Sequence, residues 1–214
     1  EIIKTNEDLI IDNNENFIIL NKPQGIPVQG GTKSFKNLID ILSKSNYFIY
    51  SKPFVVHRID KETSGILIVA KNRKYAQLFT SLFRIRKIHK TYLAITYGEI
   101  SKSIKKLEDN LVNYDNKKKI IQKAITYVKI IKTSKNFSLL ELNPLTGRKH
   151  QIRKQLYNIG HPVVGDKKYF IKKDKNKNLF LHAYKIKFMI DEKKYNYKAT
   201  YNKTFSDFIK SKFR

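Results

Sequence analysis

The sequence predicts an α+β fold, built on a large, mostly antiparallel mixed sheet with flanking helices. Short runs rich in β-branched residues recur along the chain and are separated by Asn, Asp, Gly or Pro, as expected of strands. Only a few segments place apolar residues at helical spacing, and they do not alternate regularly with the strands. This order argues against a parallel βαβ sheet. With 214 residues the chain can bury a sizeable core, and we expect a single domain over residues 1–214.

The N-terminal part predicts a hairpin followed by a helix. Residues 9–20 consist of two apolar runs around an Asn/Asp-rich centre, which is typical of a β-hairpin. After the flexible Gly30-Gly31 pair, Ser34 is a candidate N-cap. The apolar residues that follow it have helical spacing: Phe35, Leu38, Ile39 and Leu42.

A buried strand and an amphipathic helix are expected next. Residues 66–70 are uniformly apolar and predict a strand with both faces covered. Asn72 is a candidate N-cap for a helix that ends near three basic residues, as suits a helix C-terminus. The predicted inner stripe of this helix comprises Tyr75, Leu78, Phe79 and Leu82.

The second half of the chain predicts further strands and two helices. The interpretation of the polar, lysine-rich residues 101–119 is loops and a surface hairpin. A helix is expected over residues 148–158, with Gly160 ending it, and a charged loop over residues 167–178. A last short helix is expected over residues 204–212. The predicted strands are residues 92–97, 124–131, 137–142, 179–190 and 195–201.

The charge balance indicates a polyanionic partner. Lys and Arg number 44 against 18 Asp and Glu, a formal charge of +26, and nucleic acid is the natural counterpart. A compositional bias toward Lys, Ile and Asn also raises this number, and both explanations stay open. The chain has no cysteine, which excludes disulfides and thiolate metal sites and fits a reducing cytoplasm. No apolar run approaches the roughly 20 residues needed to cross a bilayer, so we expect no membrane association.

One polar segment between apolar runs carries a distinctive set of groups: His57-Arg58-Ile59-Asp60-Lys61-Glu62-Thr63-Ser64-Gly65. The hydroxyls and the glycine supply turn chemistry beside the following strand. Such a turn can present the Asp60 carboxylate to a reacting group. The alternative is that Asp60 is only a turn acid.

This segment resembles the catalytic motif of the RluA-type pseudouridine synthases, His-Arg-Leu-Asp-x-x-Thr-Ser-Gly, with Ile59 in place of Leu. Three further stretches match in order: Asn21-Lys22-Pro23-Gln24-Gly25, Lys90-Thr91-Tyr92-Leu93-Ala94, and Thr146-Gly147-Arg148-Lys149-His150-Gln151-Ile152-Arg153. The resemblance covers about residues 9–190. It implies the pseudouridine synthase fold with a central active-site cleft. Many members of the family carry an N-terminal RNA-binding domain of the S4 type, to which nothing in this sequence corresponds.

The resemblance implies that Asp60 is the catalytic carboxylate of an isomerase that converts uridine to pseudouridine in RNA. The target base must be flipped out of its helix. The family's pattern places Arg58 where the base was and Tyr92 against the flipped uracil, as a candidate to assist proton removal at C5. The alternative for Tyr92 is a core aromatic on a strand.

Three more residues are expected at the site by the same resemblance. Arg153 is the cation that pairs with Asp60, and Arg148 is a candidate phosphate ligand near a helix N-terminus. The alternative for both is a solvated basic helix face. Leu181 is either an apolar wall of the pocket or an ordinary core residue. Gln155 departs from the family, which often has histidine there, and this puts local packing or RNA contact in doubt.

The implied partner is structured RNA, and no metal or cofactor is expected. None of the five histidines lies in a metal-binding motif, and no nucleotide fingerprint is present. Val28-Gln29-Gly30-Gly31 resembles the branch that acts on large-subunit ribosomal RNA. A transfer RNA substrate and a non-catalytic, basic RNA-binding or ribosome-assembly protein stay open as alternatives. We expect a cytoplasmic monomer.

Overall fold

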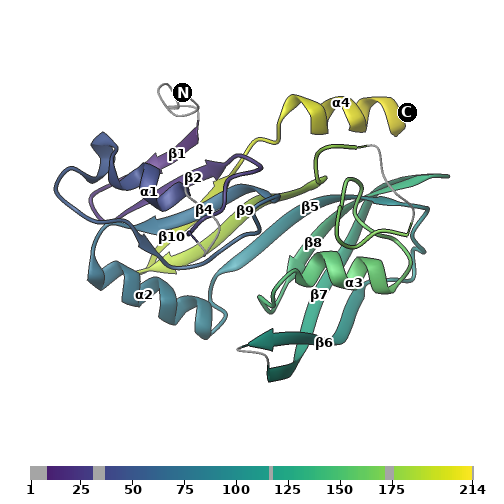
Figure 1. The fold of residues 1–214 in the computed structure, drawn as a ribbon, viewed down its shortest axis with the longest axis horizontal. Coiled ribbons are helices and arrows are strands. Elements are labelled where there is room, and N and C mark those ends of the chain that lie inside the picture. The colour runs from purple at the N-terminus through teal and green to yellow at the C-terminus, as the bar shows by residue number, and fades with distance from the viewer. Residues whose placement is uncertain (1–8, 31–36, 116–117, 172–175, 214) are drawn as a thin grey trace. The chain divides into compact units, whose positions relative to one another are not determined.

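The computed structural model describes residues 9–30, 37–115, 118–171 and 176–213. It divides into two compact units (Figure 1). Unit 1 comprises Glu1–Ile88 and Ala183–Thr200, and unit 2 comprises His89–His182 and Tyr201–Arg214. Gly31, Ser34 and Phe35 of the predicted elements lie outside the described residues. The single domain over residues 1–214 and the central cleft stay predictions.

Unit 1 is a set of paired strands with helix α2 packed on it. Its strands follow the order β1-β2-β4-β9, with β3 on β4 and β10 on β9. Their bounds are β1 Ile10–Asn13, β2 Phe17–Lys22, β3 Phe54–Val55, β4 Ser64–Ala70, β9 Leu181–Ile190 and β10 Lys193–Lys198. The helices are α1 Leu38–Ser43, the 3-10 turn η2 Asn46–Phe48, and α2 Arg73–Arg84. The predicted hairpin, buried strand and α2 are confirmed.

Aromatic side chains dominate the core of unit 1. Phe17 of β2 meets Phe79 of α2 edge-on at 5.3 Å between ring centroids, and Phe188 of β9 lies 6.0 Å from Phe17. The predicted stripe of α2 packs against this cluster. Asn72 caps α2 as predicted, because its side-chain oxygen accepts from the backbone N–H of Tyr75 at 2.9 Å.

Unit 2 is a four-stranded antiparallel sheet in the order β5-β8-β7-β6. Its strands are β5 His89–Tyr97, β6 Lys106–Asp115, β7 Lys118–Ser134 and β8 Phe137–Pro144. Helix α3, Gln151–Asn158, contributes Ile152 and Leu156 to an aliphatic core with Leu140 and Leu142 of β8. Helix α4, Lys203–Lys212, packs Phe205 and Phe208 against Phe180.

The surface hairpin expected within residues 101–119 is confirmed, because β6 pairs antiparallel with β7 from Lys106 opposite Tyr127 to Asp115 opposite Lys118. Two other sequence-based expectations need correction. The N-cap of α1 is Asn37, whose side chain accepts from Asp40 N–H at 3.1 Å, and not Ser34. Strand β10 ends at Lys198, three residues before the predicted end.

Within the described parts of the chain, no helix is long and apolar enough to cross a membrane.

Candidate active site

The loop that carries Asp60 begins where β3 ends and leads into β4. Strand β3 pairs with β4 as far as Val55 opposite Val69. One step further along β4, the Ile68 N–H is accepted by Nε2 of His57 at 2.9 Å. The imidazole also packs against Phe83 of α2, with 4.6 Å between ring centroids. The His57 side chain therefore accepts a hydrogen bond from β4 at the point where the backbone that follows β3 no longer pairs with it. This contact fixes the start of the loop.

Asp60 lies at the beginning of a tight turn. Thr63 N–H donates to the Asp60 carbonyl at 3.0 Å and closes the turn. Ile59 and Thr63 are buried on either side of it, whereas Asp60 is half-buried and Arg58 is exposed. The turn is anchored by its buried members, and the Asp60 carboxylate is positioned without being sealed from solvent.

Lys22 connects this turn to the loop that follows β2. Its ammonium, on a side chain that is 1% exposed, donates to the carbonyls of Pro23 at 2.8 Å, Ile26 at 3.0 Å and Lys61 at 3.1 Å. The Gly25 N–H also donates to the Lys61 carbonyl, at 2.9 Å. Three donors on one lysine thus satisfy three carbonyls from two loops. The first two motifs of the sequence form one hydrogen-bonded structure.

Burial has an electrostatic consequence for Lys22. Desolvation lowers the pKa of its ammonium to about 8, against the attraction of the Glu62 and Asp60 carboxylates. Keeping the Lys22 ammonium charged beside Asp60 therefore costs desolvation free energy. The three carbonyls and the two carboxylates offset this cost only in part.

Gly65 at the end of the motif is required by a close approach of β9. Its φ is +109°, and a Cβ added there would lie 2.2 Å from the carbonyl oxygen of Ala183. No other residue fits both the conformation and the space.

In unit 2, Tyr92 and Leu181 both lie on strands. Tyr92 is half-buried on β5, opposite Leu142 of β8, and packs at the edge of the aliphatic core. Leu181 is 3% exposed and belongs to that core. The core alternative describes Leu181 well, and its part in a pocket wall stays a prediction.

The segment leading into α3 is fixed to β7 by side-chain hydrogen bonds. Gln151 donates from Nε2 to the Ile125 carbonyl at 3.0 Å and accepts at Oε1 from Thr146 at 2.7 Å. Arg148 donates from its backbone N–H to the same Oε1 and from Nε to the Lys123 carbonyl at 3.2 Å. The Arg148 side chain therefore lies along β7, and phosphate binding by it stays a prediction.

Gln155, the departure from the family's pattern, is fully buried in α3. Its Oε1 accepts from the Thr126 hydroxyl at 2.6 Å, and its Nε2 donates to Asp109 at 3.0 Å and to the Ala124 carbonyl at 3.2 Å. The amide thus joins α3 to β6 and β7 with both of its ends satisfied. The doubt about packing at this position is removed.

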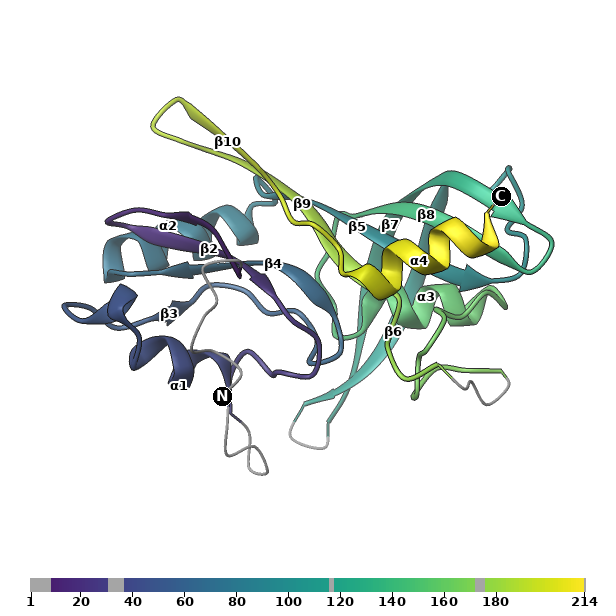
Figure 2. The same ribbon diagram turned by 90° about the horizontal axis from the view of Figure 1, so that it is seen from above.

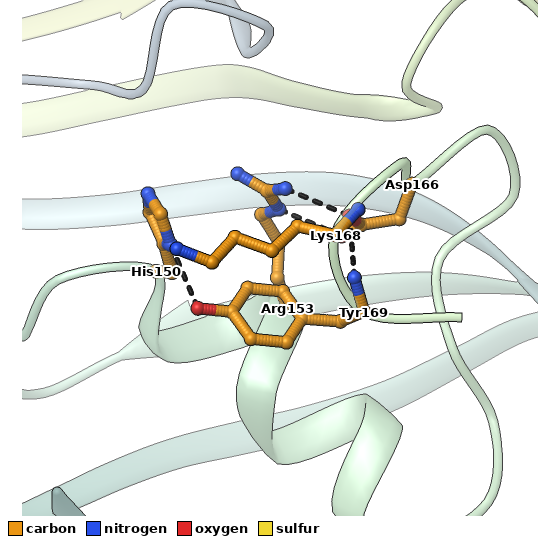
Figure 3. A network of polar contacts seen from close by, with 5 residues as sticks. All are labelled: His150, Arg153, Asp166, Lys168 and Tyr169. Carbon is orange, nitrogen blue, oxygen red and sulfur yellow. Dashed lines mark hydrogen bonds and ion pairs between the residues drawn. The ribbon is translucent and has the colours of Figure 1, made fainter. Parts of the chain in front are cut away.

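Arg153 forms a buried, two-pronged ion pair that the sequence did not predict (Figure 3). Its Nε and Nη2 each lie 2.7 Å from an oxygen of Asp166. Its guanidinium carbon lies 5.2 Å from the ring centroid of Tyr169, whose hydroxyl meets Nδ1 of His150 at 2.9 Å. Burial alone would raise the pKa of Asp166, but hydrogen bonds from Arg153 and from the N–H groups of Tyr169 and Lys168 outweigh it and lower the pKa.

Comparison with known proteins identifies the family. The model of the family described as RNA pseudouridylate synthase matches residues 16–158. The chain belongs to this family. It is 36% identical over 198 residues to the ribosomal large subunit pseudouridine synthase C of Rickettsia felis, covering 86% of this chain and 63% of the relative. The corresponding protein of Buchnera aphidicola subsp. Baizongia pistaciae is 36% identical over 211 residues, covering 88% and 65%. The chain thus spans a little under two thirds of the length of these curated relatives.

Solved structures of the pseudouridylate synthase family share the fold. Human RNA pseudouridylate synthase domain containing 4 matches with a TM-score of 0.79 at 24% identity, covering 94% of this chain and 91% of that one. Human RNA pseudouridylate synthase domain containing 1 matches with a TM-score of 0.73 at 24% identity, covering 90% and 82%. The predicted α+β pseudouridine synthase fold is confirmed.

The structure distributes the predicted site residues of this family member between the two units. Arg58 and Asp60 share one loop of unit 1, and the other four lie in unit 2: Tyr92, Arg148, Arg153 and Leu181. The pairing of Arg153 with Asp60 stays a prediction. Among the described residues, no group of three or more His, Asp or Glu is arranged to hold a metal ion.

Sequence reasoning named no role for three residues that shape the site. Lys22 and His57 lie inside the motifs that match the family, and their position there was the signal in the sequence that could have pointed to a role at the site. Asp166 follows Gly165, whose φ of +78° and close approach to the Asn178 carbonyl mark a required turn, but nothing in the sequence pointed from it to Arg153.

Proposed function

We propose that this protein is an isomerase that converts uridine to pseudouridine in large-subunit ribosomal RNA, with Asp60 as the catalytic carboxylate. One observation carries the proposal: the family's aspartate motif is intact, and its turn is fixed by Lys22, His57 and Gly65. Such positioning is what a single catalytic carboxylate needs.

The reaction breaks the bond between ribose C1′ and uracil N1 and forms a bond between C1′ and C5, after which C5 loses its hydrogen. Asp60 can attack C1′ or uracil C6 as a nucleophile, or it can take a sugar proton to give a glycal. All three routes require an ionised carboxylate with access to the base. The half-buried, anchored position of Asp60 suits that requirement.

The remaining site residues have proposed roles around the flipped base. Tyr92 stacks on the uracil, Arg58 fills the place that the base leaves, and Arg153 keeps Asp60 ionised. Arg148 contacts phosphate, and Leu181 lines the pocket. The ion pair between Arg153 and Asp166 supports the role of Arg153, because two hydrogen bonds fix the direction of its guanidinium.

Large-subunit ribosomal RNA is the proposed substrate because the relatives from Rickettsia and Buchnera are named for it. The formal charge of +26 fits a polyanionic substrate. We infer that the protein works as a monomer in the cytoplasm, where ribosomes are assembled. Transfer RNA is the competing substrate.

The test follows tritium release from uracil C5 in ribosomal and transfer RNA transcripts. We expect the native protein to release tritium from the ribosomal RNA transcripts. We expect Asp60→Asn to abolish this release. Glu62→Gln is the matched control, because Glu62 is an exposed carboxylate on the same turn and should leave release intact. RNA binding without release from any transcript would refute the enzyme and favour the non-catalytic RNA-binding protein.

A further inference from the structure

The hairpin of β9 and β10 in unit 1 has two chemically opposite faces. The strands run side by side (Figure 2) and are joined by Asp191 and Glu192, both at positive φ, as in the tight turns that suit hairpins. One face packs into the core of unit 1, with Phe188 and Tyr195 stacked at 5.0 Å between ring centroids. The residues on it are Ile186, Phe188, Ile190, Tyr195 and Tyr197.

The other face is basic. Its three cross-strand pairs are Lys185 with Lys198, Lys187 with Asn196, and Met189 with Lys194. These six residues, here called the lysine face, include four lysines and no carboxylate. Lys187, Lys194 and Lys198 are exposed, and Met189 is 54% exposed.

Two lysines of the lysine face stand directly opposite one another. Like charges directly opposite one another on a sheet destabilise it, and Lys185 stands directly opposite Lys198. The ammonium groups of both lie about the ring of Tyr184, at 5.0 and 5.1 Å from its centroid. This contact offsets the repulsion in part and concentrates positive charge at one point.

We propose that the lysine face binds the phosphate backbone of double-stranded RNA. The choice of duplex follows from the side chains. Binding of unpaired bases uses aromatic rings as stacking platforms. None of the six residues of this face is aromatic, and the neighbouring ring of Tyr184 already contacts the ammonium groups of Lys185 and Lys198. A surface of lysines that lacks aromatic rings for stacking, and lacks several amide side chains for reading base edges, recognises the charge and shape of the nucleic-acid backbone.

This inference rests on the proposed function for its substrate, but its test does not need turnover. The probe is a short, blunt RNA duplex without a target uridine, and its affinity is measured by fluorescence anisotropy over a range of salt concentrations. Each phosphate contact contributes about 0.9 to the slope of log affinity against log salt, measured for DNA. Replacing Lys185, Lys187, Lys194 and Lys198 with Gln should lower this slope by about 3 to 4.

Two matched variants decide the result. Replacing the same four lysines with Arg should preserve the slope. Replacing four exposed lysines elsewhere with Gln, namely Lys135, Lys203, Lys210 and Lys212, removes equal charge and should change the slope by less than about 1. An unchanged slope in the first Gln variant, or an equal loss in the control, overturns the inference. Failure of tritium release with normal duplex binding would instead count against the proposed function alone.

Discussion

Replacing Lys22 with Met tests whether a buried charge supports the Asp60 turn. Lys22 has an ordinary pKa of 10.5 that burial lowers to about 8. At about 1.4 kcal/mol per pH unit, this difference means that folding keeps Lys22 charged at neutral pH at a cost of about 3 kcal/mol. The Met variant escapes that cost but leaves the carbonyls of Pro23, Ile26 and Lys61 without their common donor.

The sign of the pH dependence follows from these values. Below pH 8 both the folded and the unfolded chain carry the proton on Lys22, so the full cost is present. Between about pH 8 and 10.5 the unfolded chain binds more protons, and folding stability rises with pH. The free energy of unfolding of the native protein should therefore increase by about 3 kcal/mol relative to Lys22→Met across this window.

Urea unfolding of both proteins at intervals from pH 7 to 10.5 measures this difference directly. Lys61→Met is the control, because the Lys61 side chain is exposed and its loss should leave the pH dependence as in the native protein. Parallel stability curves for native protein and Lys22→Met would refute the reasoning. They would mean that the three carbonyls keep the ammonium fully charged at all these pH values.

Three further variants test individual contacts by urea or thermal unfolding. Gly65→Ala should cost about 2 to 4 kcal/mol through the clash with the Ala183 carbonyl and the positive φ, while Gly25→Ala, with φ +85° and open space, should cost only about 1 kcal/mol. Equal losses would contradict the close approach of β9. Asp166→Asn should cost about 3 to 5 kcal/mol at neutral pH by removing the carboxylate charge that the buried Arg153 guanidinium faces in this ion pair. Because the pKa of Asp166 is lowered, this stabilisation is present above the ordinary value of 3.8 and is lost as pH falls through the folded value, so the two proteins should converge in acid. The exposed pair of Lys203 and Asp207 provides the control, since Asp207→Asn should change stability by less than about 1 kcal/mol. Gln155→Leu should cost about 1 to 3 kcal/mol by leaving the Ala124 carbonyl without its donor, and an unchanged midpoint would show that the network is dispensable.

Apolar stripes and runs predicted the elements with the strongest hydrophobic pattern. Helix α2 and strand β4 follow their expected bounds closely, because a continuous apolar stripe or run must be buried. The bounds of β6 were not predicted because its buried residues are Leu107 and Leu111, and most of its other residues are polar or charged. The cap of α1 was misplaced for a different reason: Ser34 and Asn37 are equally good cap residues, and only tertiary contacts decide between them.

The candidate site was predictable as a list of residues and not as a structure. Four motifs in order identified the family, and the match over residues 16–158 confirms it. The partners of those residues are non-local, and no spacing rule gives them. Lys22 meets the carbonyl of a residue 39 positions away, and Arg153 meets Asp166 across a turn. Hydrogen bonds of this kind depend on which strands pair.

The discontinuity of unit 1 has a consequence for how the protein is synthesised. Lys22 and Asp60 leave the ribosome early, but the unit is completed by Ala183–Thr200, which comes after all of β5 to α3. Ile186, Phe188 and Ile190 of that late segment belong to the core that α2 covers. A nascent or truncated chain that stops before Ala183 therefore has an unfinished core beside its aspartate loop. Unit 2 is likewise completed by a late segment, Tyr201–Arg214, so neither unit can become native until the segments that follow His182 have been synthesised.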